Sequence, residues 1–160
     1  MMVEKMIKII CIGKLKEKYL VDGINEYLKR LSRFIKVEII ELKEYPSFDE
    51  SQSSIDKTKV EEGKEILSKI SNEYVIALDP NGLMLDSIEF SKKLESIYIN
   101  SSDITFIIGG SYGLSSSVKD RANYLMSFSK LTFPHQLFRL ILLEQIFRAY
   151  KIMRNETYNK

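Results

Sequence analysis

The residues best suited to chemistry lie in the last third of this sequence, where apolar runs end. One run ends in the glycine-rich segment GGSYG at 109–113, and another ends in the polar segment 128–133. The only histidine, His135, follows Pro134 directly after that polar segment. Because glycine has no Cβ, its backbone can lie against a bound ligand. This combination favours a small-molecule site with walls built largely from main chain.

A third apolar run ends at Leu78 and is followed by Asp-Pro-Asn-Gly at 79–82. This segment predicts a turn, because an Asn-Gly pair tolerates positive φ. Ligands of parallel sheets bind beyond the carboxyl ends of the strands. Three such ends favour a cofactor pocket, and the alternative is that all three are plain turns.

Signatures of several other site classes are missing. The 109–113 segment lacks the pattern of a P-loop, and no G-x-G-x-x-G follows the first apolar run, where Gly13 stands alone. One cysteine, Cys11, and one histidine far from it cannot form a structural zinc site. Ser111 lacks the surroundings of a nucleophile elbow. We therefore expect a bound cofactor to supply most of the chemistry, without a metal.

The apolar segment after the histidine predicts a helix over 136–153. Glu144, Arg148 and Lys151 share one polar stripe at 100° per residue, and most of the remaining circumference is apolar. A 160-residue α/β domain covers only part of such a helix. We therefore expect a homodimer with two-fold symmetry.

Three polar residues near or on this helix invite two interpretations each. Arg139 lies on the apolar face, so its guanidinium must meet either a carboxylate in an ion pair across the dimer or a phosphate of a substrate. His135 begins the helix, where the positive end of the dipole favours a neutral imidazole that can accept a proton; the alternative is a capping or core residue. Tyr158 is either a frayed end or an aromatic that reaches over a neighbouring site.

The elements that must position these residues alternate along the chain. Predicted strands are Ile7–Ile12, Val37–Leu42, Tyr74–Leu78, Ile104–Ile108 and Tyr124–Phe128. Predicted helices are Glu17–Leu31, Ile55–Ile70, Ser87–Ile97, Ser116–Ala122 and Gln136–Met153. Strands that alternate with helices, and are themselves continuously apolar, predict an α/β fold: a mostly parallel sheet covered by helices on both faces.

Composition and charge narrow the function classes. No apolar run approaches the roughly 18 residues of a membrane span, and a single cysteine fits a reduced, cytoplasmic setting. Residues 14–36 carry seven Lys or Arg against three acids, residues 119–160 eight against three, and residues 37–118 seven against fifteen. Two basic ends around an acidic middle indicate a polyanionic partner, although solvated helix surfaces would give the same pattern.

Together these residues resemble the RlmH family of SPOUT-class methyltransferases. The resemblance is carried by GKLKEKY at 13–19, FIIGGSYGL at 106–114 and the long segment from SFSKLTFPHQ to NETY at 127–158. It begins at about Met6, which leaves residues 1–5 as an extension of a single 1–160 domain. The resemblance implies a C-terminal trefoil knot that binds S-adenosylmethionine. It also implies a homodimer that methylates N3 of a pseudouridine in the helix 69 loop of 23S rRNA on the assembled ribosome.

The resemblance also implies roles for particular residues. The cofactor-binding residues would be Leu78, Gly109, Phe128, Ser129, Lys130, Leu131, Thr132 and Phe133. A composite site would place one subunit's cofactor beside the other's C-terminal tail, with His135 and Tyr158 as catalytic candidates near the reacting base. RNA phosphates would be contacted by Arg139, Arg148, Lys151 and Arg154, with Lys14, Lys16 and Lys18 as a second patch. Family members commonly end in Tyr-His and a basic residue, so a role for that histidine does not transfer to Asn159.

Two other functions remain open from the sequence. A non-catalytic RNA-binding module would explain the basic ends and predicts no binding of S-adenosylmethionine. An enzyme that uses a nucleotide in the same pocket predicts stabilisation by ATP or GTP and activity without ribosomes.

Overall fold

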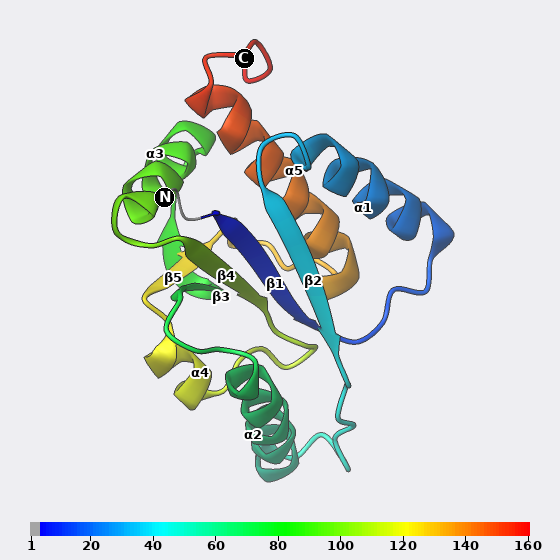
Figure 1. The fold of residues 1–160 in the computed structure, drawn as a ribbon. Helices are drawn as coiled ribbons and strands as arrows, with labels where there is room; N and C mark the ends of the chain where they lie inside the picture. Colours follow the sequence, from blue (N-terminus) through cyan, green and yellow to red (C-terminus); the bar gives the residue numbers. More distant parts are fainter. Residues whose placement is uncertain (1–3) are drawn as a thin grey trace.

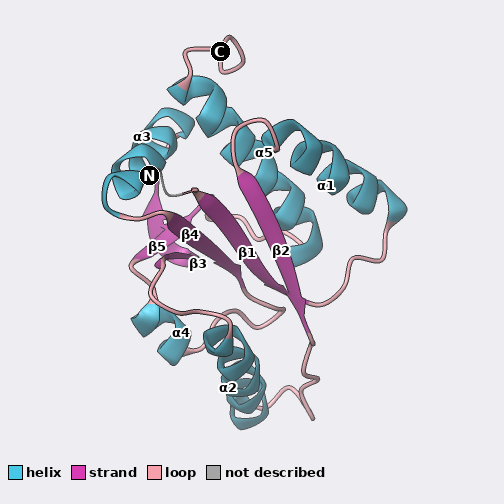
Figure 2. Cartoon of the chain, viewed as in Figure 1, coloured by secondary structure: helices cyan, strands magenta, loops and turns pink. Residues whose placement is uncertain are grey.

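Strands and helices alternate strictly in the computed structural model, which describes residues 4–160 (Figures 1 and 2). The strands are β1 (Met6–Ile12), β2 (Lys36–Leu42), β3 (Tyr74–Met84), β4 (Asp103–Ile108) and β5 (Tyr124–Ser127). The helices are α1 (Lys18–Leu31), α2 (Gln52–Ser68), α3 (Ser87–Asn100), α4 (Ser116–Arg121) and α5 (His135–Met153). With the exception of the end of β3, the predicted boundaries differ from these by no more than three residues.

The strands form one parallel sheet in the order β2-β1-β4-β3-β5. The predicted α/β fold with a parallel sheet between helices is therefore confirmed. Within this order β3 lies between β4 and β5, so the carboxyl ends of these three strands are neighbours. That adjacency decides where a site can form.

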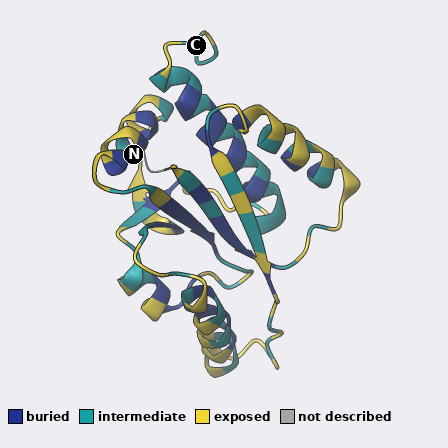
Figure 3. Ribbon diagram, in the orientation of Figure 1, coloured by how far each residue is buried: buried dark blue, intermediate teal, exposed yellow. Residues whose placement is uncertain are grey.

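Alternate residues of the strands supply two separate apolar cores. Ile7, Ile9 and Cys11 of β1 face the layer made by α1, α3 and α5, whereas Ile10 and Ile12 face α2 and α4. Figure 3 shows β1 and β4 buried, while the edge strand β2 is partly exposed along its length. Burial on both faces explains why β1 reads as an unbroken apolar run.

Helix α5 lies in the middle of its layer and packs against both α1 and α3 (Figure 1). Its first and last residues included, every position of α5 is buried or half-buried within one chain. Two flanking helices bury eight of the nineteen α5 residues and leave the other eleven half-buried, which agrees with the expectation that one domain covers only part of this helix. The homodimer stays a prediction, carried by the family resemblance.

The turn predicted at 79–82 takes another form: Leu78 and Leu83 both pair with Met126, so the residues between them bulge out of the ladder. Neither Asn81 nor Gly82 has a positive φ, and β3 continues to Met84 after an irregularity between Leu78 and Leu83 in its pairing with β5. A Cβ on Gly82 would lie 2.7 Å from backbone atoms of the facing strand. Glycine is needed at this position because the backbones of β3 and β5 approach each other closely, as is typical of irregular strand positions.

Candidate functional site

A cavity of about 260 Å³ lies at the carboxyl ends of β3, β4 and β5. Its walls come from the end of the regular part of β3 at Leu78, from the glycine-rich segment after β4 and from the connection between β5 and α5. These are the three segments singled out from the sequence. The parallel strand order brings them together, because loops that follow adjacent parallel strands leave the sheet at the same edge.

Most residues expected to bind a cofactor line this cavity. Leu78 and Gly109 do so, as do all members of the 128–133 segment except Lys130, which is exposed outside the cavity wall. Lys130 therefore has no place in the cavity of this structure. The other members of the segment offer side chains and backbone to the same space.

Aromatic rings form one wall of the cavity. Phe128 packs edge-on against Phe138 with ring centroids 4.9 Å apart, and Phe133 lies 6.0 Å from the same ring. Phe138 comes from the first turn of α5 and was not singled out from the sequence. Its position three residues after His135 could have identified it, since residues at this spacing share a helix face. The apolar wall suits a flat, weakly polar group such as a purine.

A second part of the wall is a tight turn of main chain. The N–H of Gly113, which has a φ of 86°, donates to the carbonyl of Gly110 at 3.1 Å. A Cβ on Gly109 would lie 3.0 Å from Gly113 backbone and from Leu114. Glycine is needed here so that the turn can fold back onto the end of β4, which leaves backbone groups at the cavity edge.

One carboxylate lines the cavity, and it is already paired. Asp79 is 7% exposed, accepts a hydrogen bond from the N–H of Asn81 at 2.8 Å and forms an ion pair with Lys119 of α4 at 3.0 Å. Its oxygens are held by these partners. Asp79 is therefore better suited to shaping the wall than to accepting a proton.

His135 lines the cavity at the first position of α5. Its Nε2 atom lies 4.0 Å from the position that a Cβ on Gly13 would take, just beyond the end of β1. The imidazole thus reaches toward the end of the first strand, at the border of the cavity. It is the one titratable ring that the 128–135 segment brings to this space.

Arg139 does not contact solvent, so the expected contact with RNA phosphate is wrong in this structure. Its side chain is 0% exposed, pairs with Glu41 of β2 and donates to the carbonyls of Gly13 at 2.9 Å and Ile12 at 3.3 Å. The ion-pair interpretation holds, but within one chain and not across a dimer. Arg139 fastens α5 to the ends of β1 and β2 beside the cavity.

Tyr158 lies far from the cavity of its own chain. Its ring packs edge-on against Phe147 at 5.1 Å, and its hydroxyl donates to Glu144 at 3.4 Å. The pKa of Tyr158 is raised to about 12, mainly by burial and to a smaller extent by a hydrogen bond with Tyr27. Glu144 is nine residues beyond His135 in α5, a distance of about 14 Å along the helix. Within one chain, the two catalytic candidates His135 and Tyr158 therefore do not meet.

The C-terminal tail, residues 154–160, is held against α5 by a cluster of polar side chains. Arg148 makes two 3.0 Å hydrogen bonds to Glu144, lies over the ring of Tyr158 and donates to the side-chain oxygen of Asn159 at 3.2 Å. Asn159 thus helps to order the tail. The guanidinium of Arg148 is largely committed to these partners.

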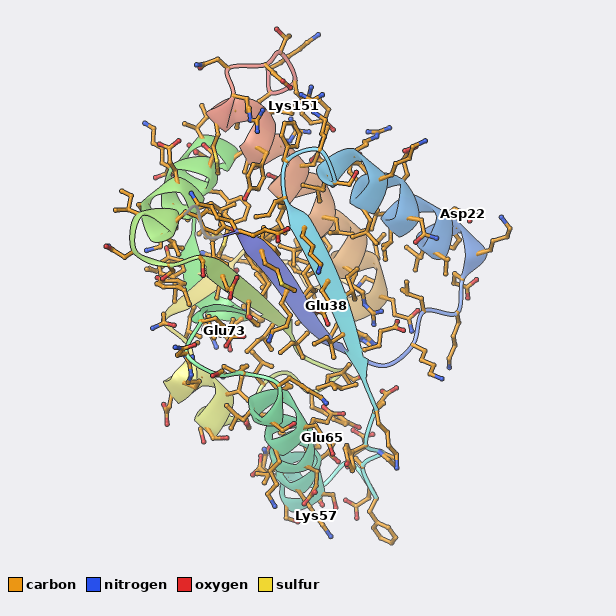
Figure 4. All side chains as sticks on the ribbon, in the orientation of Figure 1. Asp22, Glu38, Lys57, Glu65, Glu73 and Lys151 are labelled. Carbon is orange, nitrogen blue, oxygen red and sulfur yellow. The ribbon has the colours of Figure 1, made fainter. Side chains whose placement is uncertain are left out.

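The remaining predicted phosphate contacts differ in availability. Lys151, labelled in Figure 4 near the end of α5, pairs with Glu156 at 2.8 Å. Arg154 is exposed, and its guanidinium lies over the ring of Phe34. Lys14, Lys16 and Lys18 are exposed before and at the start of α1. Arg154 is therefore the most available cation of the C-terminal set.

Residues 4–160 contain no cluster of His, Cys, Asp and Glu that could hold a metal ion. Among the same residues, no helix combines the length and hydrophobicity needed to cross a membrane.

Comparisons with known proteins agree on one family. A family model described as "Predicted SPOUT methyltransferase" matches residues 6–159. Two relatives are both named "Ribosomal RNA large subunit methyltransferase H". The one from Enterococcus faecalis is 52% identical, and the one from Leuconostoc mesenteroides is 54% identical; each match covers 96% of this chain and 99% of the relative.

A solved structure, described as a probable methylase family protein from Haemophilus influenzae, resembles the fold with a TM-score of 0.50 and 10% identity. The likeness covers 93% of this chain and 66% of that one. At such low identity it concerns the fold only.

Proposed function

This chain belongs to the RlmH family of SPOUT methyltransferases, and we propose that it methylates large-subunit ribosomal RNA with S-adenosylmethionine as the methyl donor. The proposed target is N3 of a pseudouridine in the helix 69 loop of 23S rRNA on the assembled ribosome in the cytoplasm. The observation that carries the proposal is the cavity in which three consecutive strand ends converge.

The cavity residues fit the proposed cofactor. Apolar side chains such as Leu78 and Phe138 would pack against the adenine, while the backbone at Gly109 and in the 128–133 segment would bond its polar edges. The sulfonium of the bound cofactor supplies an activated methyl group. The protein's own contribution is to hold the reacting atoms in line and to exclude water, which can lower a barrier by several kcal/mol. A trefoil knot formed by the C-terminal third of the chain would bring these loops together.

Methylation of N3 requires loss of the N3 proton. His135 is the better candidate to accept it, because its imidazole lines the cavity and histidine commonly acts as a general base near neutral pH. The pKa of Tyr158 is raised to about 12, so its hydroxyl stays protonated and is suited to donate a hydrogen bond to the base. We assign His135 the role of base and Tyr158 that of donor.

The separation of these two residues supports a homodimer. Tyr158 is anchored to the far half of α5, so it can meet the cavity only if a second subunit supplies it. We propose that each site combines one subunit's cavity and His135 with the other subunit's C-terminal tail. Lys151 in the last turn of α5 and Arg154 directly after it would contact RNA phosphates, and Arg148 would order the tail around Tyr158.

The test uses 70S ribosomes from cells that lack this protein. Purified protein and isotopically labelled S-adenosylmethionine are added, and mass analysis of the helix 69 fragment reports the gain of one methyl group. His135→Ala should slow the reaction about 100-fold while the cofactor Kd, measured by calorimetry, changes less than threefold. Tyr158→Phe should slow it about tenfold, as expected for one lost hydrogen bond.

Other outcomes identify the rival functions. An absence of calorimetric binding to S-adenosylmethionine would favour the non-catalytic RNA-binding module. Thermal stabilisation by ATP or GTP, without stabilisation by S-adenosylmethionine, would favour the nucleotide-dependent enzyme. Full activity of a forced monomer would contradict the composite site.

A further inference from the structure

Two arginines share one aromatic ring at the surface where α1 and the C-terminal tail meet. The guanidinium of Arg33 lies 4.3 Å from the ring centroid of Phe34, and that of Arg154 lies 5.1 Å from the same centroid. The Arg33 side chain is 55% exposed although it also pairs with Glu156 of the tail. Both cations therefore rest on a common support and keep part of their surface in water.

A third arginine uses the neighbouring rings in the same way. Arg30 lies 4.9 Å from the ring centroid of Tyr27 and 5.9 Å from that of Phe147, and its side chain is 45% exposed. Its nearest carboxylate, on Glu26, is 3.6 Å away and itself exposed. Arg30 extends the row of stacked guanidiniums along the last turns of α1.

A surface hollow of about 790 Å³ adjoins this row, lined by the end of α1, the start of β2 and residues just before β1. Lys5, Arg33 and Lys36 contribute its cations and Glu4 its acid. Lys36 is exposed and has no ion pair within residues 4–160. The hollow therefore carries a positive excess in a protein whose formal net charge is only +2.

Stacked arginines suit one kind of ligand group in particular. The ring fixes the guanidinium plane, so less side-chain entropy is lost when its N–H groups bind. Those N–H groups form a fork that matches two oxygens of one phosphate. Several forks along a groove match the regular spacing of phosphates in a nucleic-acid backbone.

We infer that Arg30, Arg33, Lys36 and Arg154 form a binding surface for the phosphate backbone of the substrate RNA. This inference rests on the proposed function, which supplies RNA as the partner. The surface is distinct from Lys14, Lys16 and Lys18, which lie at the opposite end of α1.

The position of the tail connects this surface to the proposed composite site. The ion pair between Arg33 and Glu156 ties α1 to the tail, and the contact of Tyr158 with Phe147 ties the same tail to α5. An arrangement that brings Tyr158 to a partner's cavity therefore brings the stacked arginines with it. RNA bound across them would be led toward the reacting base.

The test removes two charges without releasing the tail. In Arg30→Gln/Arg154→Gln the pair between Arg33 and Glu156 is kept. The control is Lys57→Gln/Lys59→Gln, which removes two charges from α2, far from Lys151 in Figure 4. Affinity for 70S ribosomes from cells lacking the protein is measured over a range of KCl concentrations, and the Kd for S-adenosylmethionine is measured by calorimetry.

We expect the arginine double variant to bind ribosomes about tenfold more weakly. The plot of log affinity against log salt should become shallower by about 2, since each lost phosphate contact removes about 1. Its cofactor Kd should stay within twofold. Ribosome affinity and a salt slope equal to those of the lysine control would overturn the inference, as would a parallel loss of cofactor affinity, which would indicate general damage. Failure of the proposed function gives a different result: the unaltered protein neither binds cofactor nor methylates ribosomes.

Discussion

The Oε1 atom of Glu62 lies 3.0 Å from the position that a Cβ on Gly110 would occupy. Glu62, on α2, is 4% exposed, and its carboxylate accepts a hydrogen bond from the N–H of Tyr45 at 3.1 Å. Within residues 4–160, no Lys or Arg forms an ion pair with it. A buried carboxyl group thus stands directly behind the glycine-rich wall of the cavity.

This placement predicts a specific pH dependence of stability. Burial raises the pKa of Glu62; the hydrogen bond from Tyr45 lowers it and nearby Glu44 raises it again, leaving it above the ordinary value of 4.5. A raised pKa in the folded state contributes stability that is fully present below the unfolded value and is lost as pH rises through the folded one. We expect Glu62→Gln to be more stable than the unaltered protein at pH 8, with the difference vanishing near pH 4.

Urea unfolding at several pH values measures this difference. Glu61→Gln is the control, because it removes one charge from the neighbouring, more exposed position of the same helix. A Glu62→Gln difference that stays constant between pH 4 and pH 8 would contradict ionisation of Glu62 as the cause.

Gly110→Ala should weaken cofactor binding. The added Cβ would lie 3.0 Å from Glu62 and 3.3 Å from Ile12, so either these side chains or the turn must move by a few tenths of an ångström. Overpacking of this kind costs about 1 kcal/mol or more of stability, and we expect roughly a tenfold rise in the Kd for S-adenosylmethionine by calorimetry. Ser116→Ala, which shortens an exposed side chain at the start of α4 outside the cavity lining, is the control. An unchanged Kd for Gly110→Ala would show that the turn does not hold the ligand.

Removal of Glu41 should destabilise the protein strongly. Its loss leaves the 0%-exposed guanidinium of Arg139 with backbone carbonyls as its only partners. An uncompensated buried charge costs about 3 kcal/mol, so Glu41→Ala should lower the free energy of unfolding by about that amount. Glu38→Ala, at an exposed position of the same strand, should change it by less than about 0.5 kcal/mol. Equal effects of the two substitutions would mean that the ion pair contributes little.

Cys11 should be inert in the folded protein. Burial raises the pKa of its thiol to about 11, although the charge of Arg139 acts in the opposite direction. At pH 8 the thiolate fraction is then about 0.1%, some two orders of magnitude below that of a free cysteine. A chromogenic disulfide reagent should label less than one thiol per chain over an hour in native buffer and one per chain in guanidinium chloride. Rapid labelling of the native protein would contradict the burial.

The sequence predicted the elements well because their patterns are local. Continuous apolar runs such as Ile7–Ile12 identify strands buried on both faces, and the apolar periodicity of 136–153 identifies a helix. Alternation of the two implies a parallel sheet, and a parallel sheet implies a site at the strand ends. The convergence of Leu78, Gly109 and the 128–133 segment followed from these steps.

What the sequence left undecided depends on residues far apart in the chain. Arg139 could have met a phosphate or a carboxylate, and only the fold brings Glu41 to it across 98 positions. The sequence predicts that Gly82 serves a turn, and only the structure shows that the backbone of β5 lies against this glycine. Local patterns fix which residues are apolar and how often they recur, whereas the partner of a buried charge is chosen by packing between distant segments. For that reason the sequence determined the sheet and its edge, and only the tertiary structure decided which polar groups are free to act there.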